Sequence, residues 1–221
     1  IELYATPEDK ITVLYAGASS AFRPVTDSNQ LMKIRKHYKL GENPFVLSVG
    51  TLQPRKNHVT LIKAFEQAFR DSEYNLVLAG GRGWSYEEVH ELVRSRGLQH
   101  RVLFPGFVAD EDLSALYSSA DVMTFPSLYE GFGLPVLEAM ACGVPVLASN
   151  TSCLPEVAGS AALFVDPRNI EAMSDALLKL VSNVDLRKTL REKGFERVEQ
   201  FSWQSSAVKL LGVYRDLAQS S

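Results

Sequence analysis

Two glutamates separated by seven residues border a glycine-rich loop, and they are the side chains of this 221-residue sequence best suited to chemistry. The stretch reads Glu130-Gly-Phe-Gly-Leu-Pro-Val-Leu-Glu138. Pro135 stands where a first helical residue belongs, so the N–H groups of Gly133, Leu134 and the first helical turn are predicted to point at an anion. A carboxylate repels phosphate, so Glu130 and Glu138 are better suited to accept hydrogen bonds from sugar hydroxyls of the same ligand.

A second loop combines a glycine with two adjacent cations, in the stretch Gly50-Thr-Leu-Gln-Pro-Arg-Lys-Asn. Arg55 and Lys56 can neutralise a dianion, and the N–H groups at the start of the next helix can bond its oxygens. Basic turns of this kind are also common on solvated surfaces. The local pattern by itself leaves the phosphate site and the solvated turn equally open.

Two further loops are weaker candidates. Gly80 and Gly81 let the backbone approach a ligand closely, although they do not match the dinucleotide-binding fingerprint and a purely structural turn stays equally open. In the stretch Phe-Pro-Gly-Phe107-Val108, Phe107 can pack on a base, but an aromatic at such a place more often covers the core.

The elements that position these loops alternate between short β-rich runs and helical patterns. Six strands are expected, at residues 45–49, 75–79, 102–104, 121–125, 144–148 and 162–165. Few polar residues interrupt them, as expected of a parallel sheet covered by helices on both faces, so the predicted fold class is a doubly wound, Rossmann-like α/β domain. Its ligands bind beyond the carboxyl ends of the strands, where the four loops lie.

The remaining segments contain predicted helices and one strand-like run. Asn57 is expected to cap the helix that follows the first strand, and His58 to lie on a solvated face. After Asp166 only helices are expected, the last one capped by Ser202 and covering about residues 202–217 with an apolar stripe. The first 43 residues contain one strand-like run, at residues 11–15.

Composition excludes several classes of protein. The chain has 26 acidic and 23 basic side chains, so no strong field favours nucleic acid. A hydrophobic content of 46% is typical of a globular domain, and no signal-like or membrane-spanning run is visible. Cys142 and Cys153 are too few for a disulfide framework or a four-ligand metal site. A reducing, cytoplasmic compartment without a metal centre is therefore expected.

The motifs together resemble those of the retaining GT-B glycosyltransferases of the GT4 family, also called group 1. The resemblance rests on the two glutamates and their loop, followed by Gly-x-Pro-Val, and on the other loops in the same order: Gly-Thr-Leu-Gln-Pro-Arg-Lys-Asn, Leu-Ala-Gly-Gly, Leu-Phe-Pro-Gly-Phe-Val, Leu-Tyr-x-x-Ala-Asp and Pro-Ser. It covers roughly residues 44–180 and is specific, because order and spacing agree across four loops.

The resemblance implies a nucleotide diphosphate sugar as substrate and no separate cofactor. Lys56 and Arg55 would hold the diphosphate, Glu138 the ribose, and Glu130, as the catalytic residue, the transferred sugar. The remaining donor-binding residues would be Gly50, Thr51, Gly80, Gly81, Phe107, Val108, Gly131, Phe132, Gly133 and Leu134. Many family members have arginine where this chain has Thr51, so either Arg55 supplies that charge or the phosphate grip is weaker than usual.

The same resemblance implies how the chain is organised. Residues 1–24 would be a lead-in from an amino-terminal domain that this chain does not contain, and residues 25–221 the donor-binding domain. The absent domain would supply the site for a saccharide or lipid-linked acceptor and any approach to the cytoplasmic face of a membrane. The form of the first loop is similar to that of bacterial mannosyl- and rhamnosyltransferases, which favours GDP-mannose slightly over a UDP-sugar.

Three other functions stay open on the sequence alone. A sugar-nucleotide epimerase could use the same architecture, and product analysis without an acceptor would distinguish it. A non-catalytic nucleotide-binding module is a second alternative. Glu130 and Glu138 could also form the carboxylate pair of a glycoside hydrolase, but the anion-binding loop around Gly133 would then have no purpose.

Overall fold

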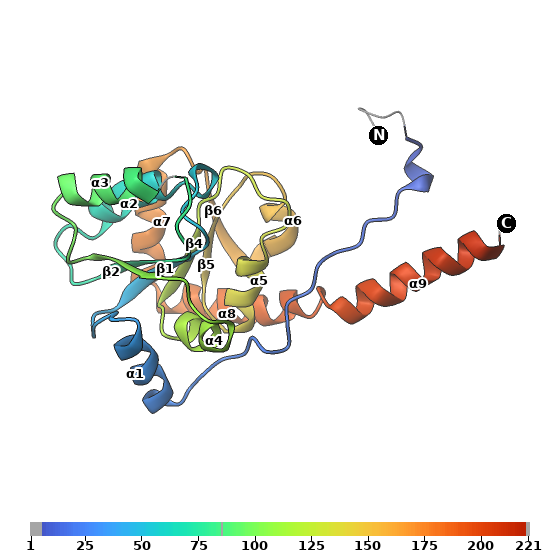
Figure 1. Ribbon diagram of the computed structural model, residues 1–221, viewed down its shortest axis with the longest axis horizontal. Helices are drawn as coiled ribbons and strands as arrows, with labels where there is room; N and C mark the ends of the chain where they lie inside the picture. The colour runs from blue at the N-terminus through green and yellow to red at the C-terminus, as the bar shows by residue number, and fades with distance from the viewer. Residues whose placement is uncertain (1–5, 85, 220–221) are drawn as a thin grey trace.

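The structure is a computed structural model that describes residues 6–84 and 86–219 (Figure 1). The first five residues of the predicted lead-in therefore lie outside the described residues.

A six-stranded parallel sheet forms the centre of the domain. Its strands are β1 (Phe45–Val49), β2 (Asn75–Ala79), β3 (Val102–Gly106), β4 (Val122–Phe125), β5 (Val146–Ser149) and β6 (Ala162–Val165). The six expected strands and the Rossmann-like fold class are confirmed, with some strand ends shifted by one or two residues. The strand order is β3-β2-β1-β4-β5-β6, so the winding direction reverses between β1 and β4. Ligands of doubly wound sheets bind at this reversal, beyond the carboxyl ends of the strands.

Helices cover both faces of the sheet because successive strand side chains point to opposite sides. On β1, Val46 packs into one apolar cluster while Phe45 and Leu47 pack into the other. The first cluster is closed by α2 (His58–Ala68), α3 (Tyr86–Ser95) and α7 (Ile170–Ser182). The second is closed by α1 (Ser28–His37), α4 (Asp110–Ser118), α5 (Leu134–Ala141) and α6 (Leu154–Ala158). Short 3-10 turns occupy Glu8–Lys10, Pro54–Lys56 and Gly159–Ala161.

Within the part of the chain that the structure describes, only helices follow β6, as the sequence predicts: α7, then α8 (Val184–Val198) and α9 (Trp203–Gln219). The predicted cap is confirmed, because the Ser202 hydroxyl accepts a hydrogen bond from the N–H of Ser205 at 3.1 Å. Helix α9 extends away from the sheet (Figure 1), and none of its described residues is buried. Its apolar stripe is therefore exposed, with Trp203, Leu211 and Tyr214 more than half accessible.

The strand expected at residues 11–15 is wrong. These residues are extended but belong to no strand of the described chain, and they run beside α9 (Figure 1). Side chains of that helix bond their carbonyls: Lys209 Nζ donates to Val13 at 2.9 Å, and the Ser206 hydroxyl donates to Tyr15. The β-like residue pattern is present, but its backbone partners are helix side chains instead of a sheet edge.

The loops after β1 and β2 approach so closely that a glycine is required between them. A Cβ atom built on Gly80 would lie 2.1 Å from the carbonyl oxygen of Gly50, and Gly80 has a φ of +155°. A Cβ atom on Gly81 would meet no heavy atom within 4 Å. The close approach at Gly80 therefore fixes how two of the candidate loops sit relative to each other.

We predict that Gly80→Ala lowers the free energy of unfolding by about 2 kcal/mol or more, because the backbone must move or stay strained. The matched variant Gly81→Ala should change it by less than about 0.5 kcal/mol. Urea unfolding of the three proteins checks this, and equal losses for the two variants would contradict it.

Candidate functional site

The loops after β1 and β4 meet at the point where the sheet reverses its winding. The N–H of Leu128 donates to the carbonyl oxygen of Arg55 at 2.7 Å, which joins the two loops through their backbones. Pro54 starts the 3-10 turn that ends at Lys56, and its fixed φ suits such a start. The turn presents both cations of the β1 loop to the β4 loop.

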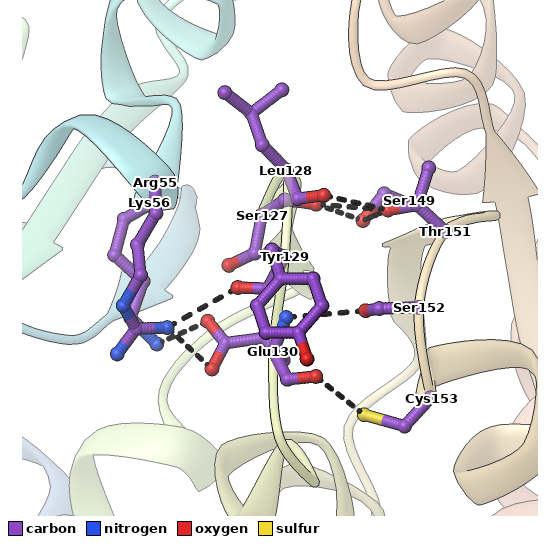
Figure 2. Close-up of polar contacts among 10 residues, drawn as sticks. All are labelled: Arg55, Lys56, Ser127, Leu128, Tyr129, Glu130, Ser149, Thr151, Ser152 and Cys153. Carbon is purple, nitrogen blue, oxygen red and sulfur yellow. Dashed lines mark hydrogen bonds and ion pairs between the residues drawn. The ribbon is translucent and has the colours of Figure 1, made fainter. Parts of the chain in front are cut away.

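Glu130 pairs with both of these cations (Figure 2). Its Oε1 lies 2.7 Å from Lys56 Nζ and its Oε2 lies 2.6 Å from Arg55 Nη1. The Lys56 and Glu130 side chains are only 10% and 8% exposed, whereas Arg55 is 46% exposed. The ammonium of Lys56 also lies 4.3 Å from the ring centre of Phe125, a cation–π contact. We call Arg55, Lys56 and Glu130 the ion triad.

Burial and pairing act in opposite directions on the pKa values of the triad. Burial alone would raise the pKa of Glu130, but the hydrogen bond and charge of Lys56, with Ser127 and Arg55, hold it below its ordinary value. Glu130 is therefore ionised at neutral pH. Burial lowers the pKa of Lys56, and its contact with Glu130 opposes that change. The pair thus offsets much of the desolvation that each charge suffers.

The backbone of Glu130 is held from the loop after β5 (Figure 2). The N–H of Glu130 donates to the Ser152 hydroxyl at 3.1 Å, and the Cys153 thiol donates to its carbonyl oxygen at 3.2 Å. Upstream, the Thr151 hydroxyl donates to the carbonyl of Ser127 at 3.3 Å. These bonds fix the peptide on both sides of Glu130, so its carboxylate can move only by side-chain rotation.

A cavity of about 190 Å³ lies beside the triad and collects many of the predicted donor-binding residues. It is lined by Val49, Gly50, Thr51, Ala79, Gly80, Gly81, Phe107, Val108, Asp110 and Leu113. Phe107 is 75% exposed, so it is not a cover over the core. A Cβ atom on Gly50 would lie 3.4 Å from Lys56 Nζ, and the glycine therefore joins the cavity to the cations.

Glu138, on α5, belongs to this region through two neighbours. Its carboxylate accepts a hydrogen bond from the buried Tyr117 hydroxyl at 2.8 Å. Burial raises its pKa, the Tyr117 bond opposes that rise, and the charge of Asp110 adds to it. Asp110 lines the cavity, whereas Glu138 is not among the lining residues and is linked to it only through the charge of Asp110. Asp110 is the first residue of α4, and nothing in its spacing along the sequence marks it as part of a cavity.

The glycine-rich loop after β4 is anchored by packing at two of its residues. Gly133 has a φ of +91°, and a Cβ atom there would lie 2.6 Å from Leu154 Cδ2. Phe132 packs in an aromatic cluster, with its ring centre 5.7 Å from that of Phe201 and 6.2 Å from that of Tyr15. Leu134 begins α5, with Pro135 in the first turn as predicted. Gly131 has open space around its Cα.

Two expectations about the β1 loop need correction. Asn57 stands at the N-cap position of α2, as expected, but its side chain makes no capping hydrogen bond with the described residues: it adopts a left-handed conformation, and its amide donates to the carbonyls of Pro126 and Pro167 at 3.1 and 2.7 Å. His58 is not on a solvated face: it is 3% exposed, and its Nδ1 has no hydrogen-bond partner among the described residues. Both residues turn inward because the β1 loop is packed against the β4 loop, which local spacing does not reveal.

No three His, Cys, Asp or Glu side chains of residues 6–84 and 86–219 come close enough together to hold a metal ion. Within the same residues, no helix has the length and apolar character needed to cross a membrane.

Comparison with known proteins gives this fold and site a family. The pattern described as "Glycosyl transferases group 1" matches residues 30–197. The chain is 36% identical over 217 residues to O-antigen chain mannosyltransferase B of Escherichia coli, covering 97% of this chain and 57% of that protein. It is 33% identical over 204 residues to the GDP-mannose-dependent alpha-(1-6)-phosphatidylinositol monomannoside mannosyltransferase of Mycobacterium tuberculosis, covering 88% and 52%.

Among solved structures, sucrose-phosphate synthase from Thermosynechococcus elongatus superimposes with a TM-score of 0.81 at 32% identity, over 93% of this chain and 52% of that chain. The chain belongs to the group 1 glycosyltransferases, which have the GT-B fold, and the predicted resemblance is confirmed. It spans about half the length of the curated relatives that it matches.

We predict that His58 makes the protein less stable in acid. Burial and the charge of Lys56 lower the pKa of His58 from 6.5 to about 4. Between these two pH values the unfolded chain binds a proton at His58 and the folded chain does not. The free energy of unfolding therefore falls as the pH drops from about 6.5 to 4, by on the order of 3 kcal/mol.

His58→Gln and His58→Leu, which cannot titrate, should each flatten this part of the stability profile. Urea unfolding at pH 7 and pH 4.5 measures the difference. Wild type and both variants losing the same free energy between these two pH values would contradict the prediction.

Proposed function

We propose that this chain is the donor-binding domain of a retaining glycosyltransferase that transfers a sugar from a nucleotide diphosphate sugar, preferably GDP-mannose, to a saccharide or lipid-linked acceptor. The observation that supports this most directly is the position of Lys56 and Arg55. Two cations lie at the reversal point of the sheet, beside a cavity lined by backbone glycines. This arrangement suits a diphosphate with a nucleoside attached.

The cavity supports guanine as the donor base. Asp110 contributes a carboxylate to its lining, and a carboxylate can accept two hydrogen bonds from the adjacent N–H groups of guanine. Uracil offers only one N–H, and a carboxylate that accepts from it is repelled by the carbonyl oxygens on either side. Phe107 supplies an exposed ring at the same opening for stacking. Both relatives are named mannosyltransferases, and the one from Mycobacterium tuberculosis is named as GDP-mannose-dependent.

The triad suits the chemistry of transfer. When the bond from the sugar to the diphosphate breaks, the electron pair leaves with the diphosphate, and Lys56 and Arg55 stabilise the charge that develops there. Glu130 accepts hydrogen bonds from the hydroxyls of the transferred sugar and orients it. Retention of configuration is part of the proposal on the strength of the motif between Glu130 and Glu138.

The acceptor belongs to the part of the protein outside this chain. The lead-in at residues 1–24 and helix α9 would connect the donor-binding domain, residues 25–221, to an amino-terminal domain that holds the acceptor. Holding two reactants in place can supply about 7 to 11 kcal/mol of a barrier. The proposal therefore gives this chain donor binding, with transfer needing both domains.

The proposal is tested by the affinity of this chain for nucleosides and their diphosphates. In a calorimetric screen of UDP, GDP and ADP, at least one should bind. Lys56→Ala should then weaken that diphosphate by about 1.5 to 3 kcal/mol through loss of a charge-assisted contact, with the nucleoside nearly unaffected. Lys33→Ala, on the exposed side of α1, is the control and should change neither. A proportionate loss for nucleoside and diphosphate would place Lys56 away from the phosphates.

The preference for guanine has its own test. Asp110→Asn replaces one of two acceptors with a donor, so the preference for GDP over UDP should fall about tenfold or more. Glu111→Gln is a matched control, because Glu111 is exposed in the same helical turn but does not line the cavity. Calorimetric titration with both nucleotides measures the ratio, and an unchanged ratio in Asp110→Asn would refute the assignment.

A further inference from the structure

We propose that Glu130 makes the donor site discriminate between the intact sugar nucleotide and the bare nucleoside diphosphate. When no sugar is present, its carboxylate pairs with Lys56 and Arg55, the cations that would bind the diphosphate. When the donor binds, the carboxylate leaves them and accepts hydrogen bonds from the sugar hydroxyls instead. The inference rests on the proposed function and assigns Glu130 a role in selectivity as well as in orienting the sugar.

The first support is that one carboxylate bridges both cations. Glu130 lies 2.7 Å from Lys56 Nζ and 2.6 Å from Arg55 Nη1, one oxygen for each (Figure 2). This is the same geometry that two phosphate oxygens would adopt toward the pair. A diphosphate therefore competes with Glu130 for its partners. If both anions stayed, they would repel each other at close range in a site with little water.

The second support is the burial of Glu130. Its side chain is only 8% exposed, so a carboxylate pushed off the cations does not gain full hydration in exchange. An ionised carboxylate left unpaired in such a place is costly. Binding of a bare diphosphate is weakened by this free-energy cost, because it leaves the Glu130 carboxylate unpaired. A donor that carries a sugar supplies hydroxyl donors to the displaced carboxylate and offsets it.

The third support is that the exchange is local. The peptide around Glu130 is bonded on both sides, by the Ser152 hydroxyl and the Cys153 thiol. The loop therefore stays in place while the carboxylate rotates between the cations and the sugar. After transfer the sugar leaves with the acceptor, Glu130 returns to Lys56 and Arg55, and the nucleoside diphosphate is released more readily.

The test compares wild type with Glu130→Gln, which keeps the shape and removes the charge. Titration calorimetry with inorganic pyrophosphate, GDP and GDP-mannose gives three affinities for each protein. Pyrophosphate and GDP should bind about tenfold or more tightly to Glu130→Gln, since no internal anion competes. The ratio of GDP-mannose affinity to GDP affinity should fall by a similar factor. A role in folding alone would weaken binding and could not tighten it.

Two controls complete the comparison. Glu192→Gln removes an equal charge from the exposed side of α8 and should leave all three affinities unchanged. Thermal unfolding shows whether Glu130→Gln is folded. If it is not, Glu130→Asp serves instead: it withdraws the carboxylate by one methylene and should tighten pyrophosphate binding in the same direction but by less.

The failure of this inference differs from the failure of the proposed function. If wild type binds none of UDP, GDP, ADP or their sugars, the donor-site proposal is wrong. If wild type binds one of these nucleoside diphosphates and the corresponding nucleotide sugar, the ratio of their two affinities is measured with that pair. An unchanged or weaker affinity of Glu130→Gln for pyrophosphate and the nucleoside diphosphate would then overturn the inference alone.

Discussion

The contact of Glu130 with Lys56 and Arg55 determines how the strands and loops around it must be arranged. Each of these two nearly buried charges needs a partner, because a buried charge without water or a partner is costly. Pairing requires β1 and β4 to be neighbours, since one strand leads to the cations and the other to the carboxylate. The reversal of the sheet between these strands thus brings the charges together and opens the space that a ligand can enter.

Several unusual residues make sense as supports for this contact. Asn57 adopts a left-handed conformation so that its amide can bond carbonyls from the β4 loop and from the segment after β6. Ser152, also left-handed, accepts the N–H of Glu130. Phe132 anchors the far side of the same loop in an aromatic cluster. Each holds the backbone in place around the carboxylate that pairs with Lys56 and Arg55.

The sequence predicts the fold well because strand and helix periodicity is local. It also identifies the four loops, since glycines and paired charges are visible in order. It does not predict that Glu130 meets Lys56 and Arg55, because 73 residues lie between Lys56 and Glu130 and only the strand order brings them together. The burial of His58 and the partners of the Asn57 side chain were not predicted for the same reason, because both environments are formed by other loops. The ligand roles of the site residues stay predictions.

Residues 11–15 and α9 form one arm, because Lys209 and Ser206 bond the carbonyls of residues 13 and 15. At the inner end of this arm the ring of Tyr15 meets Phe132, and the hydroxyl of Tyr15 bonds Glu156 of α6 at 2.7 Å. The arm therefore contacts the loop of the candidate site at Phe132, next to its glycines. The same loop that presents Glu130 to the cations is thus also the place where the arm packs on the domain.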